Sequence, residues 1–187
     1  MSRMATTAST LAWAGLSEAG LALLATLLIA LAAPAAAGDP EGDFVHAHLG
    51  DKATPGVLWL HGDLRERAAA VLGHPFRGLR VRYFGAGQKT VWILDEIGKE
   101  LPITIGVAVE GRRILEVRVL RYRESRGGEV RHPFFTDQFR GAALVEGDRL
   151  DRAIDGITGA TLSVAAVRKV ATLALLFHAH TPYGAAR

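Results

Sequence analysis

The sequence predicts an α+β fold: a single small domain built on a mainly antiparallel sheet of about four or more strands flanked by helices. Three observations predict it. Four segments are rich in β-favouring residues, short polar links of hairpin length join them in pairs, and apolar residues at helical spacing come before and after the sheet. The chain has 187 residues, of which 49% are hydrophobic, and this is enough for one core.

The predicted strands either alternate apolar and polar residues or run continuously through apolar ones. In the last of them Leu115, Val117 and Val119 are expected on one side of the sheet. The intervening Glu116 and Arg118 fall on the other side, so one face of the sheet is predicted to contact water. The four strands are predicted over residues 79–83, 90–94, 103–109 and 114–120.

Three helices are predicted around this sheet. The sequence Asp63-Leu64-Arg65-Glu66 has the pattern of a capping box, in which Asp63 would cap the helix that follows. A short helix is expected to start near Pro133, because proline is favoured in the first turn of a helix. An apolar stripe from Val164 to Leu175 predicts a long last helix that ends near His178.

The N-terminal segment has the layout of a secretory signal. Arg3 gives a charged start, residues 20–33 form an apolar run, and small residues follow up to a cleavage site after Ala37. Without cleavage, residues 20–37 would be just long enough to anchor the chain in a membrane, which is the alternative to cleavage. Either way, the folded part is expected outside the cytoplasm, in the periplasm or a similar compartment.

The chain therefore divides into a signal peptide over residues 1–37, a flexible lead-in over 38–55 and the folded domain over 56–187. Two histidine pairs, His46-Ala47-His48 and His178-Ala179-His180, lie near the ends of the exported part. Neither pair has a cysteine or a third ligand nearby in sequence, so no metal site is predicted.

Composition excludes several kinds of redox and binding protein. With no cysteine in the sequence, there is no attachment motif for c-type haem, no ligand set for an iron–sulfur cluster and no thiol pair. Basic and acidic residues are mixed along the chain, with 22 Lys and Arg against 19 Asp and Glu. A nucleic-acid surface needs clustered cations, so no nucleic-acid partner is predicted, whereas a partner with an anionic surface is left open.

The stretch 154–163 combines an acid, two glycines and three hydroxyls just before the last predicted helix. Gly156 and Gly159 allow a ligand to approach the backbone closely, and Thr161 or Ser163 would cap the helix. The free N–H groups at a helix start stabilise a phosphate without any lysine. The same residues also fit a plain turn followed by a capped helix.

The heptapeptide Asp155-Gly156-Ile157-Thr158-Gly159-Ala160-Thr161 resembles the flavinylation motif of FMN-binding domains. This family includes the C subunit of sodium-translocating NADH:quinone reductase and the G subunit of the Rnf complex. In the family, a flavin transferase takes FMN from FAD and joins its phosphate to the last threonine of the motif. The resemblance implies that Thr161 is the attachment residue, that Asp155 is the acid that the transferase requires, and that FMN lies at the start of the C-terminal helix. The cofactor-binding residues implied around Thr161 are Asp155, Gly156, Thr158, Gly159, Ala160, Leu162 and Ser163.

A second stretch supports the resemblance. Residues 122–129 resemble the Glu-Thr-Pro-Gly segment that lies upstream in the family, and residues 135–139 follow at a similar distance. Ser125-Arg126 replaces Thr-Pro here, so the turn is less constrained and an extra cation near the flavin becomes possible. The similar segments together run from about residue 101 to 177. The candidate flavin contacts in this stretch are Glu124, Arg126, Gly127 and Gly128, which also fit a plain turn with solvated charges.

Aromatic side chains are further candidates for flanking the flavin ring. Tyr83, Trp92, Phe134 and Phe135 are the ones that the pattern offers. Trp92 is expected in the core instead, because it lies in the most apolar predicted strand.

The sequence shows no catalytic centre of its own, since it has neither a Ser/His/Asp order nor a pair of carboxylates with a reason to differ in pKa. We therefore expect an electron carrier, with covalent FMN on Thr161, that is matured by a flavin transferase and works between a membrane or periplasmic electron donor and an acceptor. Two alternatives remain open. One is a flavin-dependent reductase of a small extracytoplasmic substrate, and the other is a non-redox module that senses flavin or binds a partner.

Overall fold

The computed structural model describes residues 38–184, so the predicted signal peptide over 1–37 lies outside the described residues. The described part contains a five-stranded antiparallel sheet in the order β1-β2-β3-β4-β5, which confirms the predicted α+β fold. The strands are β1 (Thr54–Trp59), β2 (Arg80–Ala86), β3 (Lys89–Ile97), β4 (Pro102–Glu110) and β5 (Arg113–Arg121). The α-helices are α2 (Pro40–Leu49), α3 (Gly62–Leu72), α4 (Pro133–Thr136) and α5 (Thr161–His178).

Short elements complete the described part. Three 3₁₀-helices are present, namely η1 (Gly50–Lys52), η2 (Gly128–Arg131) and η3 (Asp137–Phe139). A small hairpin of β6 (Leu144–Val145) and β7 (Arg149–Leu150) lies between η3 and α5 in sequence. The short helix predicted near Pro133 is thus present, as α4 followed by η3.

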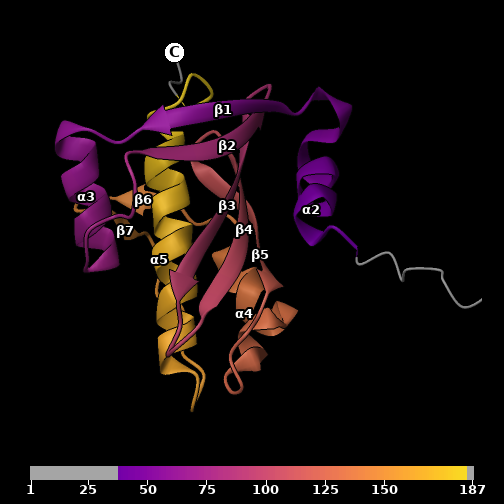
Figure 1. Cartoon of the computed structure of the whole chain (residues 1–187), viewed down its shortest axis with the longest axis vertical. Coiled ribbons are helices and arrows are strands. Elements are labelled where there is room, and N and C mark those ends of the chain that lie inside the picture. The colour runs from indigo at the N-terminus through magenta and orange to yellow at the C-terminus, as the bar shows by residue number, and fades with distance from the viewer. Residues whose placement is uncertain (1–37, 185–187) are drawn as a thin grey trace, which may run out of the picture. The chain divides into compact units, whose positions relative to one another are not determined.

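Helix α5 packs along one face of the sheet, with α3 beside it (Figure 1). Its apolar residues join those of β3, β4 and β5 in the main core. The helix is long and apolar enough to cross a membrane, but most of it is buried in the domain, so here it is the core helix of a folded domain. The predicted stripe from Val164 to Leu175 is buried along most of its length, as expected.

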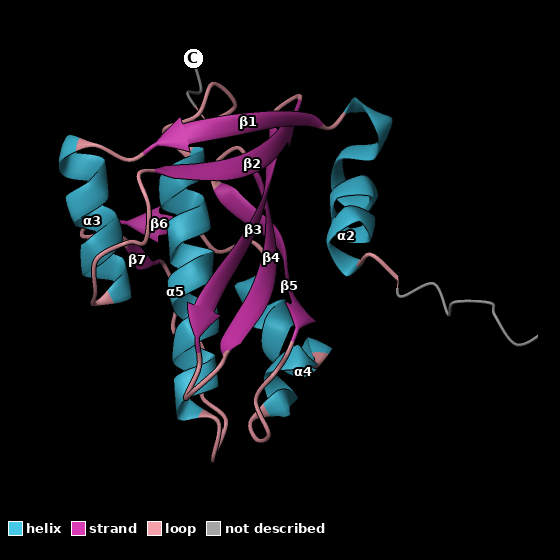
Figure 2. Cartoon of the chain, viewed as in Figure 1, coloured by secondary structure: helices cyan, strands magenta, loops and turns pink. Residues whose placement is uncertain are grey.

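Helix α2 replaces the flexible lead-in that the sequence predicts over 38–55, and it lies on the sheet side opposite α5 (Figure 2). The Asp39 side chain accepts a hydrogen bond from the N–H of Glu41, and Pro40 occupies the first turn, so the helix has a regular start. Phe44 is fully buried in a second, smaller core with Val91 and residues of β4. The prediction of a water-facing sheet surface is therefore wrong where α2 covers it.

Strand β5 departs from the predicted alternation. Its register against β4 shifts between Ala108 and Val109, so that Leu115 has no partner in the ladder. Because of this bulge, Leu115 packs in the smaller core under α2, whereas Val117 lies in the main core. The prediction that these two residues share a face is therefore wrong.

Helix α3 begins one residue before the predicted capping box. Its N-cap is His61, no side chain caps it, and Asp63 lies inside the first turn. From there the carboxylate of Asp63 contacts the guanidinium of Arg67, 3.5 Å away, one turn along the helix. The predicted cap does not form because Gly62, with φ 53°, turns the chain into the helix earlier.

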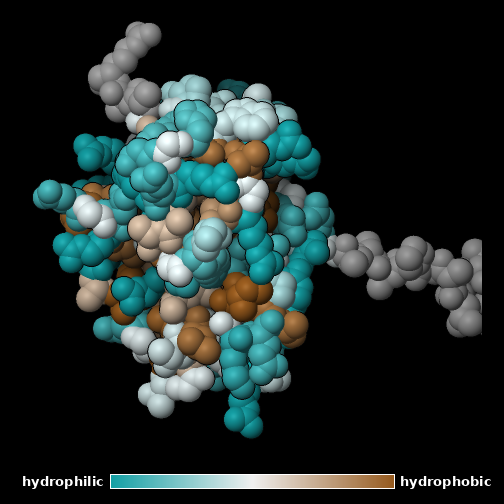
Figure 3. Space-filling model, turned by 60° about the vertical axis from the view of Figure 1, so that its left-hand side comes forward, coloured by the Kyte–Doolittle hydropathy of each residue, from teal (hydrophilic) through white to brown (hydrophobic). Residues whose placement is uncertain are grey.

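Three connections gather at one end of the domain. The β3–β4 turn, the segment after β5 and the loop before α5 all lie at the lower end in Figure 1. The face drawn in Figure 3 mixes hydrophilic residues with small hydrophobic patches and shows no single large apolar surface. The fold therefore places the two sequence stretches of interest, 122–129 and 154–163, at the same end of α5.

Candidate functional site

The site is built on the first turn of α5. Its N-cap residue is Ala160, and no side chain caps the helix. The prediction that Thr161 or Ser163 caps it is wrong, because Thr161 is itself the first helical residue. Among the described residues, none accepts a hydrogen bond from the backbone N–H of Thr161, Leu162 or Ser163. Three donors and the positive end of the helix dipole thus remain available to an anion.

The motif loop holds Thr161 on the surface. The N–H of Asp155 donates to the amide oxygen of Gln138, 2.7 Å away, which ties the loop to η3. The N–H of Ala160 donates to the carbonyl of Ile157 at 3.0 Å and closes a turn. Gly159 has φ 82°, a conformation that favours glycine, so the motif needs glycine there. The Thr161 side chain is exposed as a result.

The segment after β5 is bonded directly to this helix start. The phenol oxygen of Tyr122 lies 3.0 Å from the hydroxyl oxygen of Ser163, which is buried. The same phenol donates a short hydrogen bond to the carbonyl of Arg126. Gly127 has φ 83°, and a Cβ there would lie 2.9 Å from the Tyr122 hydroxyl and 3.0 Å from that of Ser163. Only glycine lets the segment lie this close to α5.

A polar hollow of about 590 Å³ lies between this segment and the motif loop. Thr158 and Gly159 line it on one side, and Gly127 and Gly128 on the other. Its remaining lining is mostly charged or polar, with Arg126, Arg131 and His132 all exposed. The hollow therefore brings the predicted residues of the segment after β5 next to Thr158 and Gly159 of the motif, whereas Thr161 lies outside its lining. Such a hollow offers N–H groups and cations to a ligand rich in oxygen.

Glu124 has a structural task that the sequence does not predict. Its Oε1 accepts hydrogen bonds from the N–H groups of Lys99, Glu100 and Leu101, at 2.6, 2.7 and 2.9 Å. These bonds, that of Leu101 foremost, hold the pKa of the Glu124 carboxyl below its usual range. The carboxylate thus fastens the β3–β4 turn to the segment after β5. A contact between Glu124 and a flavin stays a prediction.

The four aromatic candidates separate by burial. Trp92 and Phe135 are fully buried, and Tyr83 is almost so, with its ring stacked on Trp92 at 4.9 Å between centroids. The expectation that Trp92 lies in the core is confirmed. Phe134 is 63% exposed, and its ring stacks on that of His132, a lining residue of the polar hollow. Of the four, Phe134 is the one placed to meet a ligand.

A second hollow, of about 500 Å³, lies on the other side of Thr158. Thr161 and Arg168 both line it, seven residues apart on α5 and hence on the same face two turns along. Arg168 is exposed, and its guanidinium has no ion-pair partner among the described residues. Its charge is free to meet an anion at Thr161.

Sequence reasoning missed three residues of the site. Tyr122 and Gln138 lie within stretches that the resemblance includes, but nothing in a single sequence shows that they bond to Ser163 and Asp155. Arg168 could have been predicted, because its spacing of seven residues from Thr161 places both on one face of a helix. Leu162, 53% exposed, also lies at the helix start and offers an apolar contact.

The two histidine pairs lie away from the site. His46 and His48 belong to α2, and His178 and His180 lie at the C-terminal end of α5. Within residues 38–184, no group of three or more His, Cys, Asp or Glu side chains is placed to hold a metal ion.

The geometry suits a phosphate ester better than a reaction between side chains. An exposed threonine hydroxyl, three free N–H groups and a nearby cation would together stabilise a phosphate on Thr161. In comparisons with known proteins, residues 98–176 match a family model described as an FMN-binding domain. The match includes both the segment after β5 and the motif loop. No curated protein matches the chain.

Proposed function

We propose that this chain is an exported flavoprotein that carries electrons with its FMN attached to Thr161, because residues 98–176 match a family model described as an FMN-binding domain, which indicates FMN as the cofactor. The observation that supports the attachment best is the uncapped start of α5, where an exposed threonine hydroxyl stands beside three unbonded N–H groups. A helix start of this kind stabilises the phosphate of a phosphoester.

The attachment is a group transfer that balances without a redox step. The Thr161 hydroxyl oxygen forms a bond to the flavin-side phosphorus of FAD, the pyrophosphate bond breaks, and AMP leaves with the second phosphate. The hydroxyl proton goes to a base or to water. A separate flavin transferase performs this step, and exposed Asp155, six residues before Thr161, is the acid that it would require.

The residues around Thr161 have distinct proposed tasks. The N–H groups of Thr161, Leu162 and Ser163 hold the phosphate. The backbone at Gly127 and Gly128 lines the polar hollow next to the motif, where it would bond the polar edge of the ring system. When bound, FMN supplies reversible electron uptake and release, which no side chain in this cysteine-free chain provides.

Export supports the covalent link by a simple argument. Outside the cytoplasm a flavin lost from its site cannot be replaced from a cytoplasmic pool, so a covalent bond keeps the protein loaded. We place the protein in the periplasm or a similar compartment, with a cleaved signal over residues 1–37 preferred to a membrane anchor. Its partners would be the flavin transferase and a membrane or periplasmic electron donor and acceptor.

Intact mass tests the attachment. We expect the full chain, coexpressed with a flavin transferase and exported, to gain the mass of one FMN less one water, with flavin fluorescence that survives denaturation. Thr161→Val should abolish the gain, because it removes the attacking oxygen and keeps the side-chain shape. The matched control is Thr54→Val, which removes another exposed threonine hydroxyl and should leave the gain intact. An unmodified wild-type chain, or a modified Thr161→Val chain, contradicts the proposal.

A reductase is the second candidate, and the polar hollow of about 590 Å³ beside the motif favours it, since a small substrate could share that hollow with the ring. It requires the loaded protein to reduce a small acceptor over many turnovers when a chemical reductant such as dithionite supplies the electrons and no partner protein is present. A carrier instead shows one round of reduction and oxidation with partner proteins. If Thr161→Val leaves the biological role unchanged, the non-redox flavin-sensing or partner module replaces both.

A further inference from the structure

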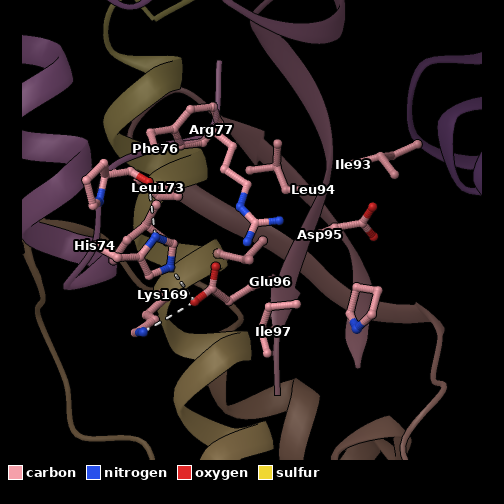
Figure 4. Close-up of a pocket in the computed structure, with 14 residues that line it drawn as sticks. His74, Phe76, Arg77, Ile93, Leu94, Asp95, Glu96, Ile97, Lys169 and Leu173 are labelled. Atoms are coloured by element: carbon pink, nitrogen blue, oxygen red, sulfur yellow. Dashed lines mark hydrogen bonds and ion pairs between the residues drawn. The ribbon is translucent and has the colours of Figure 1, made fainter. Parts of the chain in front are cut away.

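A separate hollow of about 970 Å³ lies between the end of α3, strand β3 and α5 (Figure 4). None of its lining residues belongs to the motif loop or to the segment after β5. Its walls are largely apolar, and Leu72, Phe76, Leu94, Val170 and Leu173 provide them. A concave, mostly apolar site of this size with a few polar groups is typical of a small-molecule site.

The acid that faces into this hollow, Glu96, already has basic partners. Glu96 is only 6% exposed, and its Oε1 lies 3.3 Å from the Lys169 ammonium nitrogen and 3.2 Å from Nε2 of His74. Figure 4 shows these three side chains meeting, with dashed lines that join Glu96 to His74 and to Lys169. A cationic ligand would have to displace Lys169 from this carboxylate, so the geometry disfavours cations.

The other lining acid faces away. Asp95 lies on the side of β3 opposite Glu96, as Figure 4 shows, and its carboxylate accepts a hydrogen bond from Thr104 at 2.6 Å. Arg77 behaves differently. Its side chain extends between Phe76 and Leu94 toward the hollow, and it forms no ion pair within residues 38–184. The Arg77 guanidinium is therefore a positive charge without an acidic partner, among the described residues, in the lining of an apolar hollow.

We propose that this hollow binds a small carboxylic acid with a flat, apolar body. The carboxylate pairs with the Arg77 guanidinium, which presents a fork of N–H donors that matches two carboxylate oxygens. The body lies against Phe76, Leu94 and Ile97, of which Ile97 is 42% exposed, so it removes apolar surface from water. A neutral ligand of the same shape lacks the charged partner for Arg77 and binds less tightly. The site is independent of Thr161 and of its flavin.

Titration calorimetry on the full chain, with 2-naphthoate and its neutral counterpart 2-naphthamide as probes, tests this proposal. We expect 2-naphthoate to bind at least about tenfold more tightly than the amide, and Arg77→Gln to remove that difference. Arg77 is exposed, so the substitution should not disturb folding. The matched control is Arg80→Gln, which removes an exposed arginine on neighbouring β2 that does not line the hollow and should leave binding unchanged.

Amide chemical shifts locate the probe. With 2-naphthoate, the largest changes should fall on residues 72–77, 93–97 and 169–173, which surround the hollow. The proposal is overturned if 2-naphthoate does not bind at millimolar concentration, if the amide binds equally well, or if the shifts gather at residues 122–132 beside the flavin motif. Unmodified Thr161 would contradict the flavin proposal and leave this one standing, because no residue of the hollow depends on the flavin.

Discussion

The hydroxyl of Tyr122 lies 3.0 Å from that of Ser163, and this contact joins the segment after β5 to the first turn of α5. The two residues are 41 positions apart in sequence. This contact between Tyr122 and Ser163 holds the glycines that line the polar hollow against the helix start that carries Thr161. The shape of the candidate flavin site therefore depends on one hydroxyl pair between side chains, as well as on the backbone of the motif.

Removing the Tyr122 hydroxyl should loosen this connection. We expect Tyr122→Phe to lower the free energy of unfolding by about 1–2 kcal/mol, because the phenol makes two hydrogen bonds, with Ser163 and with the carbonyl of Arg126, and each is worth about 1 kcal/mol between uncharged groups. Urea denaturation measures it, and Tyr183→Phe is the matched control, because the Tyr183 hydroxyl makes no hydrogen bond among the described residues. With Ser163→Ala as partner in a double-mutant cycle, the two effects should not add. Additive effects would mean that the pair does not interact.

The sheet could be predicted because its strands carry strong local signals. Strand β4 is apolar at nearly every position, and the turns on either side of it are short. Strand β1 was missed because Pro55 and Gly56 lie inside it, which argues against a strand in sequence alone. In the structure it is an edge strand, and a side chain at Gly56 would collide with the ring of Tyr83 on β2.

Helix α2 was missed although its start signal is present. Asp39 followed by Pro40 is a regular helix beginning, but the segment lies next to a predicted cleavage site and looks too polar for a core element. Only the fold reveals that Phe44 and Leu49 have a sheet face to cover. The bulge that redirects Leu115 is equally invisible in sequence, because the alternation itself gives no sign of the extra residue.

The part of the site that depends on backbone conformation could be predicted from the sequence. The glycines and Thr161 predict that a ligand comes close to the backbone at a helix start, and in the structure Gly127 and Gly159 have positive φ. What the sequence does not contain is the pairing of side chains across long separations. Glu124 illustrates this, because its carboxylate is oriented by backbone N–H groups 23 to 25 residues earlier.

Glu124 should therefore act on the β3–β4 turn. We expect Glu124→Ala to speed amide hydrogen exchange at residues 99–101 and to lower the melting temperature, because three N–H groups lose one carboxylate oxygen. The lowered pKa means that this support is present above the ordinary value of 4.5 and is lost as pH falls through the folded-state pKa. The control is Glu129→Ala. Glu129 is exposed and its carboxylate makes no hydrogen bond within residues 38–184, so amide exchange at residues 99–101 should not change.

The Arg168 guanidinium should interact with a phosphate on Thr161. In Arg168→Gln we expect attachment of FMN to be about two- to fivefold slower, the size of an exposed charge interaction of up to about 1 kcal/mol. The ³¹P resonance of the attached phosphate should also shift. Arg149→Gln, an exposed arginine outside the hollow of Thr161, provides the control. A modified protein with an unchanged ³¹P resonance would remove Arg168 from the site without affecting the case for Thr161.

His178 should make stability depend on pH. The Thr90 hydroxyl accepts from the indole N–H of Trp92 and lies 2.7 Å from Nδ1 of His178, so it is placed to donate to that nitrogen, and burial lowers the pKa of the imidazole. The folded protein therefore resists a proton that the unfolded chain takes up as pH falls through the ordinary value of 6.5. The contribution is complete above that pH and is lost below it, down to the folded-state pKa.

His178→Asn should flatten this dependence, since the asparagine oxygen can still accept from Thr90 but does not titrate. Between pH 7 and 5 we expect the wild-type free energy of unfolding to fall by on the order of 1 kcal/mol more than that of the variant, by urea denaturation. His48, whose pKa is also lowered by burial, adds a loss of the same sign that both proteins share. His46→Asn makes the same substitution at an exposed histidine of α2 and is the matched control. If the free energy of unfolding falls equally between pH 7 and 5 in wild type and His178→Asn, the buried imidazole does not cause the loss of stability in acid.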